Sequence, residues 1–461
     1  MNTTAEKDLG SGSIGKLLFQ LALPAIIAQI INVLYNMVDR MYIGHIPDIG
    51  ATALTGMGIT MPVITAISAF AALVSMGGAP LASIRMGQKK PEQAEKILGN
   101  CAGLLVILSL VLTLFFEIFG KDILMIFGAS ESTIGYAWDY MKIYALGTIF
   151  VHLSLGLNAF ISAQGYSKIS MYTVLLGAIC NIVLDPIFIF VFEMGVQGAA
   201  LATIISQALS SIWVVYFLTS KKSFLRLKLK YMKPDVSIIL PCLALGLSPF
   251  IMQLTESVIN VCFNTSLLKY GGDLAVGAMT ILGSLMQFSL LPLQGLTQGS
   301  QPIISFNFGA NNLDRVKKTF KILLISSIIY STLFWALSMI APGLLISIFT
   351  SNDELIQFSK RAIHTYMAAT FIFGIQLACQ QTFIALGNAK TSLFLALLRK
   401  VILLIPLIYI IPRFVSDPVF GVFLAEPVAD VIAVTVTASM FLYSFKKLVH
   451  QNQKAENAEN I

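Results

Sequence analysis

Apolar runs of about 20 residues or more recur along the whole chain, each long enough to cross a bilayer as a helix. We count about twelve such runs, separated by polar or basic connections. Charged residues make up only 11% of the 461 residues, too few to cover the surface of a soluble protein of this size. The runs are continuous and do not alternate, which argues against a transmembrane β-barrel. The sequence therefore predicts an all-α integral membrane protein.

Lys and Arg residues gather in alternate connections between these runs. The basic connections are 7–16, 85–96, Lys168, 221–233, 315–321, Lys390 and 446–454. They hold 21 of the 30 basic residues, and the positive-inside rule places them, with both termini, on the cytoplasmic side of a cell membrane. This topology accounts for the formal net charge of +7, so nothing in the sequence favours binding to nucleic acid.

The two halves of the chain repeat one another. The block "GGAPLASIRMGQ" matches "GSQPIISFNFGA", with Pro80 and Gly87 each 222 residues before Pro302 and Gly309. Other matched pairs follow in the same order. The sequence predicts two six-helix bundles in tandem, an N-lobe and a C-lobe, which suits rocking around a substrate site at their interface. The predicted divisions are an N-lobe at 1–220, a linker at 221–236, a C-lobe at 237–447 and a cytoplasmic tail at 448–461. We expect the basic, amphipathic linker to lie on the inner leaflet.

The stretch "NIVLDPIFIF" places polar groups in the middle of an apolar run. Asn181 and Asp185 are four residues apart and share one helix face, while Pro186 lacks an N–H and should kink the helix there. Acids inside a membrane are costly, so each suggests a function, and these oxygen ligands suit an alkali cation or a proton. The alternative is a structural kink with Asp185 held by a hydrogen bond. The matching stretch "VILLIPLIYI" lacks both polar residues, which favours a cation site in the N-lobe alone.

Four other acids are predicted inside the membrane. They are Asp39, Glu256, Glu426 and Asp430. Glu426 and Asp430 again share one helix face, but Arg399 and Lys400 lie in the preceding helix and would neutralise them. A structural role is therefore a stronger alternative for this pair than for Asp185.

These features together resemble the multidrug and toxic compound extrusion (MATE) family of transporters. The resemblance rests on "LALPAII", "VDRMYIG", "GGAP", "GSQPIISFNFGA", "NAFISAQG", "NIVLDPIF" and "GVQGAALAT", in order along about residues 15–447. It implies a V-shaped pair of six-helix lobes. It also implies export of bulky, often cationic, amphipathic compounds in exchange for Na⁺ or H⁺.

The resemblance also implies particular site residues. The family's N-lobe cation site is similar at Asp39, Asn158, Asn181, Asp185 and Thr203. Some members use a glutamate in the seventh helix, and Glu256 is similar in position. We expect the N-lobe set to bind the coupling ion, Glu256 to be a drug contact or second proton site, and Glu426 with Asp430 to be a third candidate. Met252, Met286 and Phe288 are candidate drug contacts.

Other function classes are less well supported. A lipid-linked saccharide flippase of the same superfamily should carry a strongly cationic cavity, whereas acids dominate the intramembrane charge here. The chain has no G-x-x-x-x-G-K-[ST] motif, no metal-ligand spacing among its five Cys, and no catalytic set among its four His. We expect neither an enzyme nor a channel. We also expect no cofactor or metal beyond the coupling ion, and a monomer whose partners are lipid and small-molecule drugs.

Overall fold

The computed structural model describes residues 9–459, with side chains described up to residue 447. Within this part of the chain every regular element is a helix. Nine of the described helices are long and apolar enough to span a membrane, and the number of such spans rises to eleven if each of two bent pairs forms one span. Helix α9 (Val236–Gly309) is 74 residues long and breaks at Gly272, where φ is 63°, so it supplies two spans rather than one. The described chain thus holds the twelve spans that the sequence predicted.

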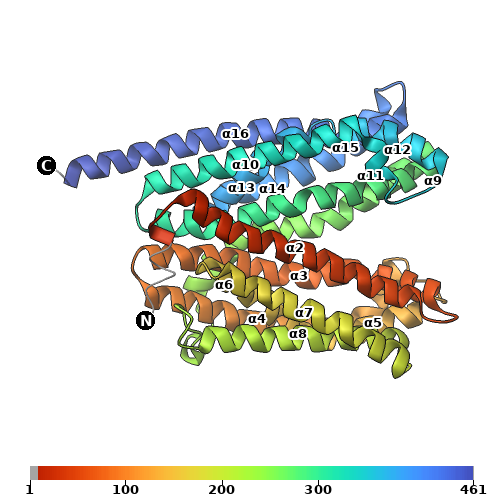
Figure 1. The fold of residues 1–461 in the computed structure, drawn as a ribbon, viewed down its shortest axis with the longest axis horizontal. Helices are drawn as coiled ribbons and strands as arrows, with labels where there is room; N and C mark the ends of the chain where they lie inside the picture. Colours follow the sequence, from red (N-terminus) through yellow and green to blue (C-terminus); the bar gives the residue numbers. More distant parts are fainter. Residues whose placement is uncertain (1–8, 460–461) are drawn as a thin grey trace.

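The helices of the first half are listed here in chain order. They are α2 (Ile14–Gly44), α3 (Gly50–Gly87), α4 (Pro91–Ile126), α5 (Ile134–Leu146), α6 (Thr148–Ala163), α7 (Ser167–Pro186), η1 (Ile187–Val191) and α8 (Gly195–Thr219). The bent pair α5 and α6, at 58°, makes one span. Figure 1 shows most of these helices packed together in the lower part of the view, with α2 running beside the second half.

The second half forms the other lobe in the upper part of Figure 1. Besides α9 it contains α10 (Leu313–Ile340), α11 (Pro342–Ile346), α12 (Asp353–Tyr366), α13 (Thr370–Ala385), α14 (Ala389–Leu397), η3 (Leu398–Leu404), α15 (Ile405–Ile410), η4 (Ile411–Arg413) and α16 (Pro418–Glu459). The bent pair α12 and α13, at 50°, makes one span. Part of the predicted tail, 448–459, continues α16, and Lys7 lies outside the described residues.

The predicted linker packs against α4 of the first half. The Asn100 side chain accepts from the backbone N–H of Asp235 at 2.6 Å and donates to the Tyr231 carbonyl at 3.1 Å. Lys228 pairs with Glu95 on the same helix. The start of α9, which opens the second half of the chain, is therefore anchored on a helix of the first half.

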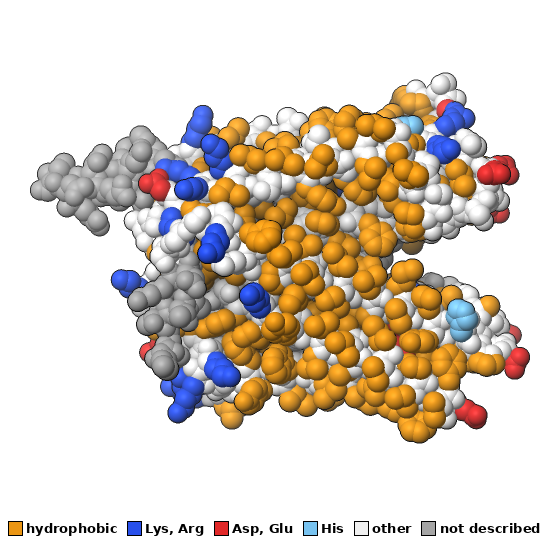
Figure 2. Space-filling model, in the orientation of Figure 1, with side chains coloured by type: hydrophobic (Ala, Val, Ile, Leu, Met, Phe, Trp, Pro, Cys, Tyr) orange, Lys and Arg blue, Asp and Glu red, His pale blue; other side chains and the backbone are white. Residues whose placement is uncertain are grey.

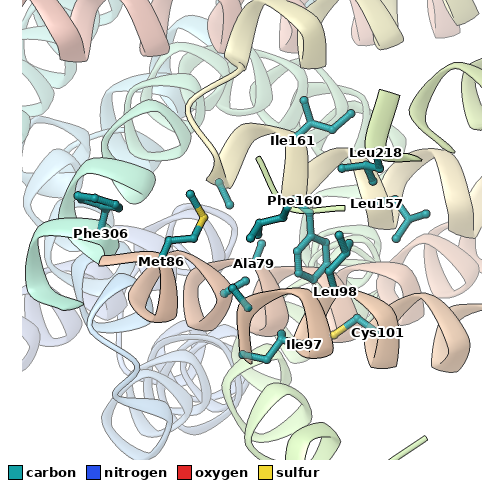
Figure 3. Packing of buried hydrophobic residues seen from close by; sticks show 14 of the residues in the cluster. Ala79, Met86, Ile97, Leu98, Cys101, Leu157, Phe160, Ile161, Leu218 and Phe306 are labelled. Atoms are coloured by element: carbon teal, nitrogen blue, oxygen red, sulfur yellow. The ribbon is translucent and has the colours of Figure 1, made fainter. Parts of the chain in front are cut away.

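The lobes meet through glycines near one end of the molecule. We term it the basic end, because most of the visible Lys and Arg side chains lie there (Figure 2). A Cβ added to Gly87 at the end of α3 would overlap the carbonyl oxygen of Phe306 on α9, and one added to Gly309 would overlap that of Ile84. The repeat aligns Gly87 with Gly309. The same close backbone approach therefore occurs twice, with the glycine on α3 in one contact and on α9 in the other. Figure 3 shows Phe306 near Met86, beside the core around Phe160.

The lobes separate at the other end of the molecule. In Figure 2 hydrophobic side chains cover the middle of the face, most visible Lys and Arg side chains lie at one end, and a notch divides the lobes at the opposite end, where acids are visible. The hydrophobic band and the charge asymmetry match those expected of a multi-pass membrane protein.

The short segment 9–12, which we term the latch, joins the two lobes at the basic end. The Leu9 carbonyl accepts from the Asn307 amide at 2.8 Å, and the Arg315 guanidinium donates to the Gly12 carbonyl at 2.9 Å. The Leu9 side chain is only 1% exposed and lies in a core cluster made mainly of first-half residues. The latch is thus held by the core of one lobe and by polar groups of the other.

Gly87→Val should destabilise the closed end of the interface. The added side chain meets backbone rather than a flexible side chain, and overpacking of this kind costs about 1–3 kcal/mol or more. We expect a lower melting temperature of the purified protein in detergent, measured by thermal-shift size-exclusion chromatography. Gly58→Val on the same helix is the control, because a Cβ there meets nothing within 4 Å. Equal stability of the two variants would contradict the packing described here.

Candidate functional site

The polar residues of α7 meet a hydroxyl of α8 inside the first lobe. The Asn181 amide donates to Oδ1 of Asp185 at 3.2 Å and to Oγ1 of Thr203 at 3.4 Å. Asp185 is fully buried and Asn181 is 1% exposed. The spacing of four residues that the sequence shows therefore does bring the amide and the carboxylate together on one helix face.

Asp39 of α2 reaches the same point from another helix. Its side chain is 4% exposed and lies close enough to Asp185 for the two carboxyl groups to interact electrostatically. Within the described residues neither carboxylate forms an ion pair with Lys or Arg, and Asp39 Oδ1 and Asp185 Oδ2 have no hydrogen-bond partner. Two carboxylates in contact cannot both stay ionised without a cation between them, so this pair calls for a proton or a metal cation.

A small cavity of about 50 Å³ adjoins this pair. Asn158, Asn181 and Thr203 line it, together with Tyr35 and Ser206. Buried oxygens of Asn158, Asn181 and Ser206 have no hydrogen-bond partner in the described part of the chain. A cavity of this size has room for a few water molecules or a partly hydrated ion. Three of the five residues that the resemblance assigned to the cation site thus line this cavity, and Asp185 is joined to it through Asn181, with Asp39 beside Asp185. The unpaired groups are oxygens, which suit Na⁺ or H⁺.

The helix distortion predicted at Pro186 takes a specific form. Helix α7 ends at Pro186 and continues as the π-helical turn η1. The second lobe also carries a π-helical turn, η3, but η3 ends two residues before Pro406, the proline that aligns with Pro186, whereas η1 follows Pro186. Both lobes thus contain a π-helical distortion near the aligned proline, and Pro186 by itself does not indicate a cation site. Asp185, which the second lobe lacks, carries that information.

The three acids of the second lobe that were predicted inside the membrane are all paired with bases. Arg399 Nε donates to Asp430 at 2.7 Å and its Nη2 donates to Glu426 at 2.8 Å. Lys400 Nζ donates to Glu256 at 2.6 Å. The neutralisation expected for Glu426 and Asp430 therefore has a direct structural basis. The sequence analysis did not predict that Lys400 pairs with Glu256. The feature that could have suggested an acidic partner is the pair of bases, Arg399 and Lys400, inside an apolar run.

The candidate drug contacts fall into two groups. Met286 is buried in the core of the second lobe at 8% exposure, and Ser289 packs against its sulfur. The expectation that Met286 lines a drug site is therefore wrong, since helix packing turns it inward. Phe288 is 43% exposed and Met252 is half-buried.

Comparison with known proteins is consistent with this geometry. A family model described as MatE matches residues 24–187 and 249–410, one stretch in each half of the chain. The chain belongs to the MatE family. Multidrug export protein MepA of Staphylococcus haemolyticus (strain JCSC1435) is 26% identical over 430 residues, covering 93% of this chain and 94% of that protein. MepA of Staphylococcus aureus (strain N315) is 25% identical over 424 residues, covering 91% and 93%.

Solved structures are similar over nearly the whole chain. The MATE multidrug transporter DinF-BH, solved as a ligand complex, has a TM-score of 0.87 and 33% identity, covering 94% of this chain and 96% of that one. A MATE crystal structure in the bent conformation has a TM-score of 0.92 at 21% identity, covering 98% and 100%. The family resemblance seen in the sequence and the predicted fold are thereby confirmed.

Arg399→Leu should strongly destabilise this MatE-family protein. The change leaves Glu426 and Asp430 buried without a base, and breaking a buried ion pair in this way costs about 3–5 kcal/mol. We expect a large fall in melting temperature in detergent. Adding Glu426→Gln and Asp430→Asn to Arg399→Leu should recover much of the loss, because no unpaired charge remains. An unchanged melting temperature of the single variant would refute a structural role for the cluster.

Proposed function

We propose that this MatE-family protein exports amphipathic, often cationic organic compounds across a cell membrane in exchange for Na⁺ or H⁺. The observation that carries the proposal is the buried Asp39–Asp185 pair, which forms no ion pair with Lys or Arg among the described residues and adjoins a small oxygen-lined cavity. The MepA relatives are named as multidrug export proteins, and DinF-BH is named as a multidrug transporter. These names support organic compounds as substrates here.

The coupling mechanism follows from where the pair lies. Asp39 is on α2, which packs against the second lobe, and Asp185 is on α7 within the first lobe. A cation that enters the site removes the repulsion between the two carboxylates, so α2 and α7 can approach. Loss of the cation restores the repulsion and favours their separation. Cation binding is thereby linked to the packing of a helix at the lobe interface, as alternating access requires.

The orientation belongs to the same proposal. The Lys- and Arg-rich end, with the latch, faces the cytoplasm by the positive-inside rule, and we infer from the same rule that both termini are cytoplasmic. The notch between the lobes then opens outward, and export requires the glycine contacts and the latch to separate when the molecule opens inward.

The charges also separate this proposal from a lipid-linked saccharide flippase. Such a protein needs free cations in its cavity for a pyrophosphate group. In the described part of the second lobe, Arg399 and Lys400 are both held by acids, and the acids outnumber them by three to two. This arrangement favours a cationic rather than an anionic substrate.

Asp39→Asn and Asp185→Asn should each reduce gradient-driven efflux by more than about tenfold, because each removes an ionisable oxygen that the coupling ion needs. Ethidium efflux from proteoliposomes, driven separately by a Na⁺ gradient and by a proton gradient, measures the loss and identifies the ion. Glu131→Gln is the control, since Glu131 is an exposed acid outside the spans. If both asparagine variants pump as well as the parent, the coupling site lies elsewhere.

Arg315→Gln should loosen the latch and favour opening at the basic end. Cys242 is 1% exposed and lies in the same core cluster as Leu9, so its thiol reports on this end of the interface. In a chain that keeps Cys242 as its single cysteine, we expect a several-fold faster reaction with a membrane-permeant maleimide. The exposed Lys318→Gln on the same helix is the control. An unchanged rate would show that the latch does not hold the lobes together.

A further inference from the structure

The first half of α9 presents a polar face at the middle of the membrane. Glu256, Asn260 and Asn264 are exposed and lie at four-residue intervals, so they form one stripe. The exposed apolar residues Val258 and Val261 fall on a different face of the helix. Polar side chains are tolerated at this depth only inside the protein or along a water-filled cavity. The stripe therefore lines the space between the lobes, and the apolar face contacts lipid.

Glu256 is the one acid of the second lobe's charged cluster that reaches this space. Its side chain is 57% exposed, whereas those of Glu426 and Asp430 are only 6% and 2% exposed. Both of these buried acids are occupied by Arg399. A cation in the cleft can therefore meet one carboxylate of this cluster, that of Glu256.

That carboxylate already has a cationic partner. Lys400 approaches Glu256 from the interior of the lobe, with its Nζ at 2.6 Å and its own side chain only 10% exposed. The ammonium group thus covers the inner side of the carboxylate and leaves the other side open to the cleft. Lys400 sits on the π-helical turn η3, and turns of this kind occur frequently at functional sites.

Lys400 would still have an acidic neighbour if an organic cation bound to Glu256. Glu426 lies close enough to interact electrostatically with Lys400. The cluster holds three acids and two bases, so one negative charge is in excess when all are ionised. If Lys400 moves away from Glu256, its ammonium group can therefore interact with another acid of the same cluster, Glu426. No unpaired ammonium group is then left buried in the lobe.

We propose that Lys400 competes with a cationic substrate for the Glu256 carboxylate. It occupies Glu256 when the cleft is empty, yields it to an organic cation, and takes it back when the cation leaves. The competition weakens binding and speeds release, which an exporter needs on its outward-facing side. The inference rests on the proposed export of organic cations and adds a residue that sets affinity for them.

The test is equilibrium binding of tetraphenylphosphonium to the purified protein in detergent, without any ion gradient. Lys400→Met and Lys400→Gln should each tighten binding about fivefold, since a partly exposed ion pair contributes up to roughly that factor. Glu256→Gln should weaken binding by a similar factor. Adding Lys400→Met to Glu256→Gln should produce no gain, because Lys400 acts only through that carboxylate.

Three results would overturn the proposal. They are unchanged or weaker binding in both Lys400 variants, a gain that persists in the Glu256→Gln background, and unchanged affinity in Glu256→Gln alone. The last remains decisive even if the Lys400 variants do not fold. If the binding shifts appear but no gradient drives efflux, the proposed transport activity fails while the competition stands.

Discussion

Every charge buried in the lobes of this protein must be compensated, because water cannot solvate it within the membrane. The two lobes meet this requirement in different ways. In the second lobe Arg399 and Lys400 compensate all three acids through direct ion pairs. In the first lobe Asp39 and Asp185 face each other and, within the described chain, lack any such base. No direct ion pair among the described residues neutralises these two carboxylates, and the cation proposed above would supply the missing positive charge.

The repeat makes this asymmetry informative. Gly87 and Gly309 perform the same packing task in the two halves, and each half has a π-helical turn near its aligned proline, η1 just after Pro186 and η3 just before Pro406. Features needed to build a lobe and join it to its partner are therefore present twice. Asp185 and Asn181 are present once, and the second lobe folds without them. A residue that one copy of a repeated scaffold can omit is not required for the scaffold, so its retention in the other copy points to function.

Much of this arrangement could be predicted from the sequence, and the reasons for the limits are physical. Apolar runs, basic connections and the repeat can be read directly from the sequence. The twelve spans and the two halves could therefore be predicted from it. The contact of Asn181 with Asp185 follows from helical periodicity alone. The contact of Lys400 with Glu256 joins residues 144 positions apart, and only the packing of α9 against η3 creates it. The burial of Met286 and the latch also depend on which face each segment turns to its neighbours, and spacing within one helix does not determine this.

The contrast between the lobes also bears on how one molecule could couple two ligands. A permanently paired cluster changes little when ligands come and go, so Arg399 with Glu426 and Asp430 stiffens the second lobe. An unpaired carboxylate pair changes its net charge with every ion that binds, and the helices that carry it respond. The Glu256–Lys400 pair lies between these extremes, because it is compensated yet half open to the cleft. Because the three arrangements occupy separate positions, the proposed ion would act on the first lobe and the proposed organic cation on the second. On this proposal the two ligands influence each other through the movement of the lobes, with no need to share a carboxylate.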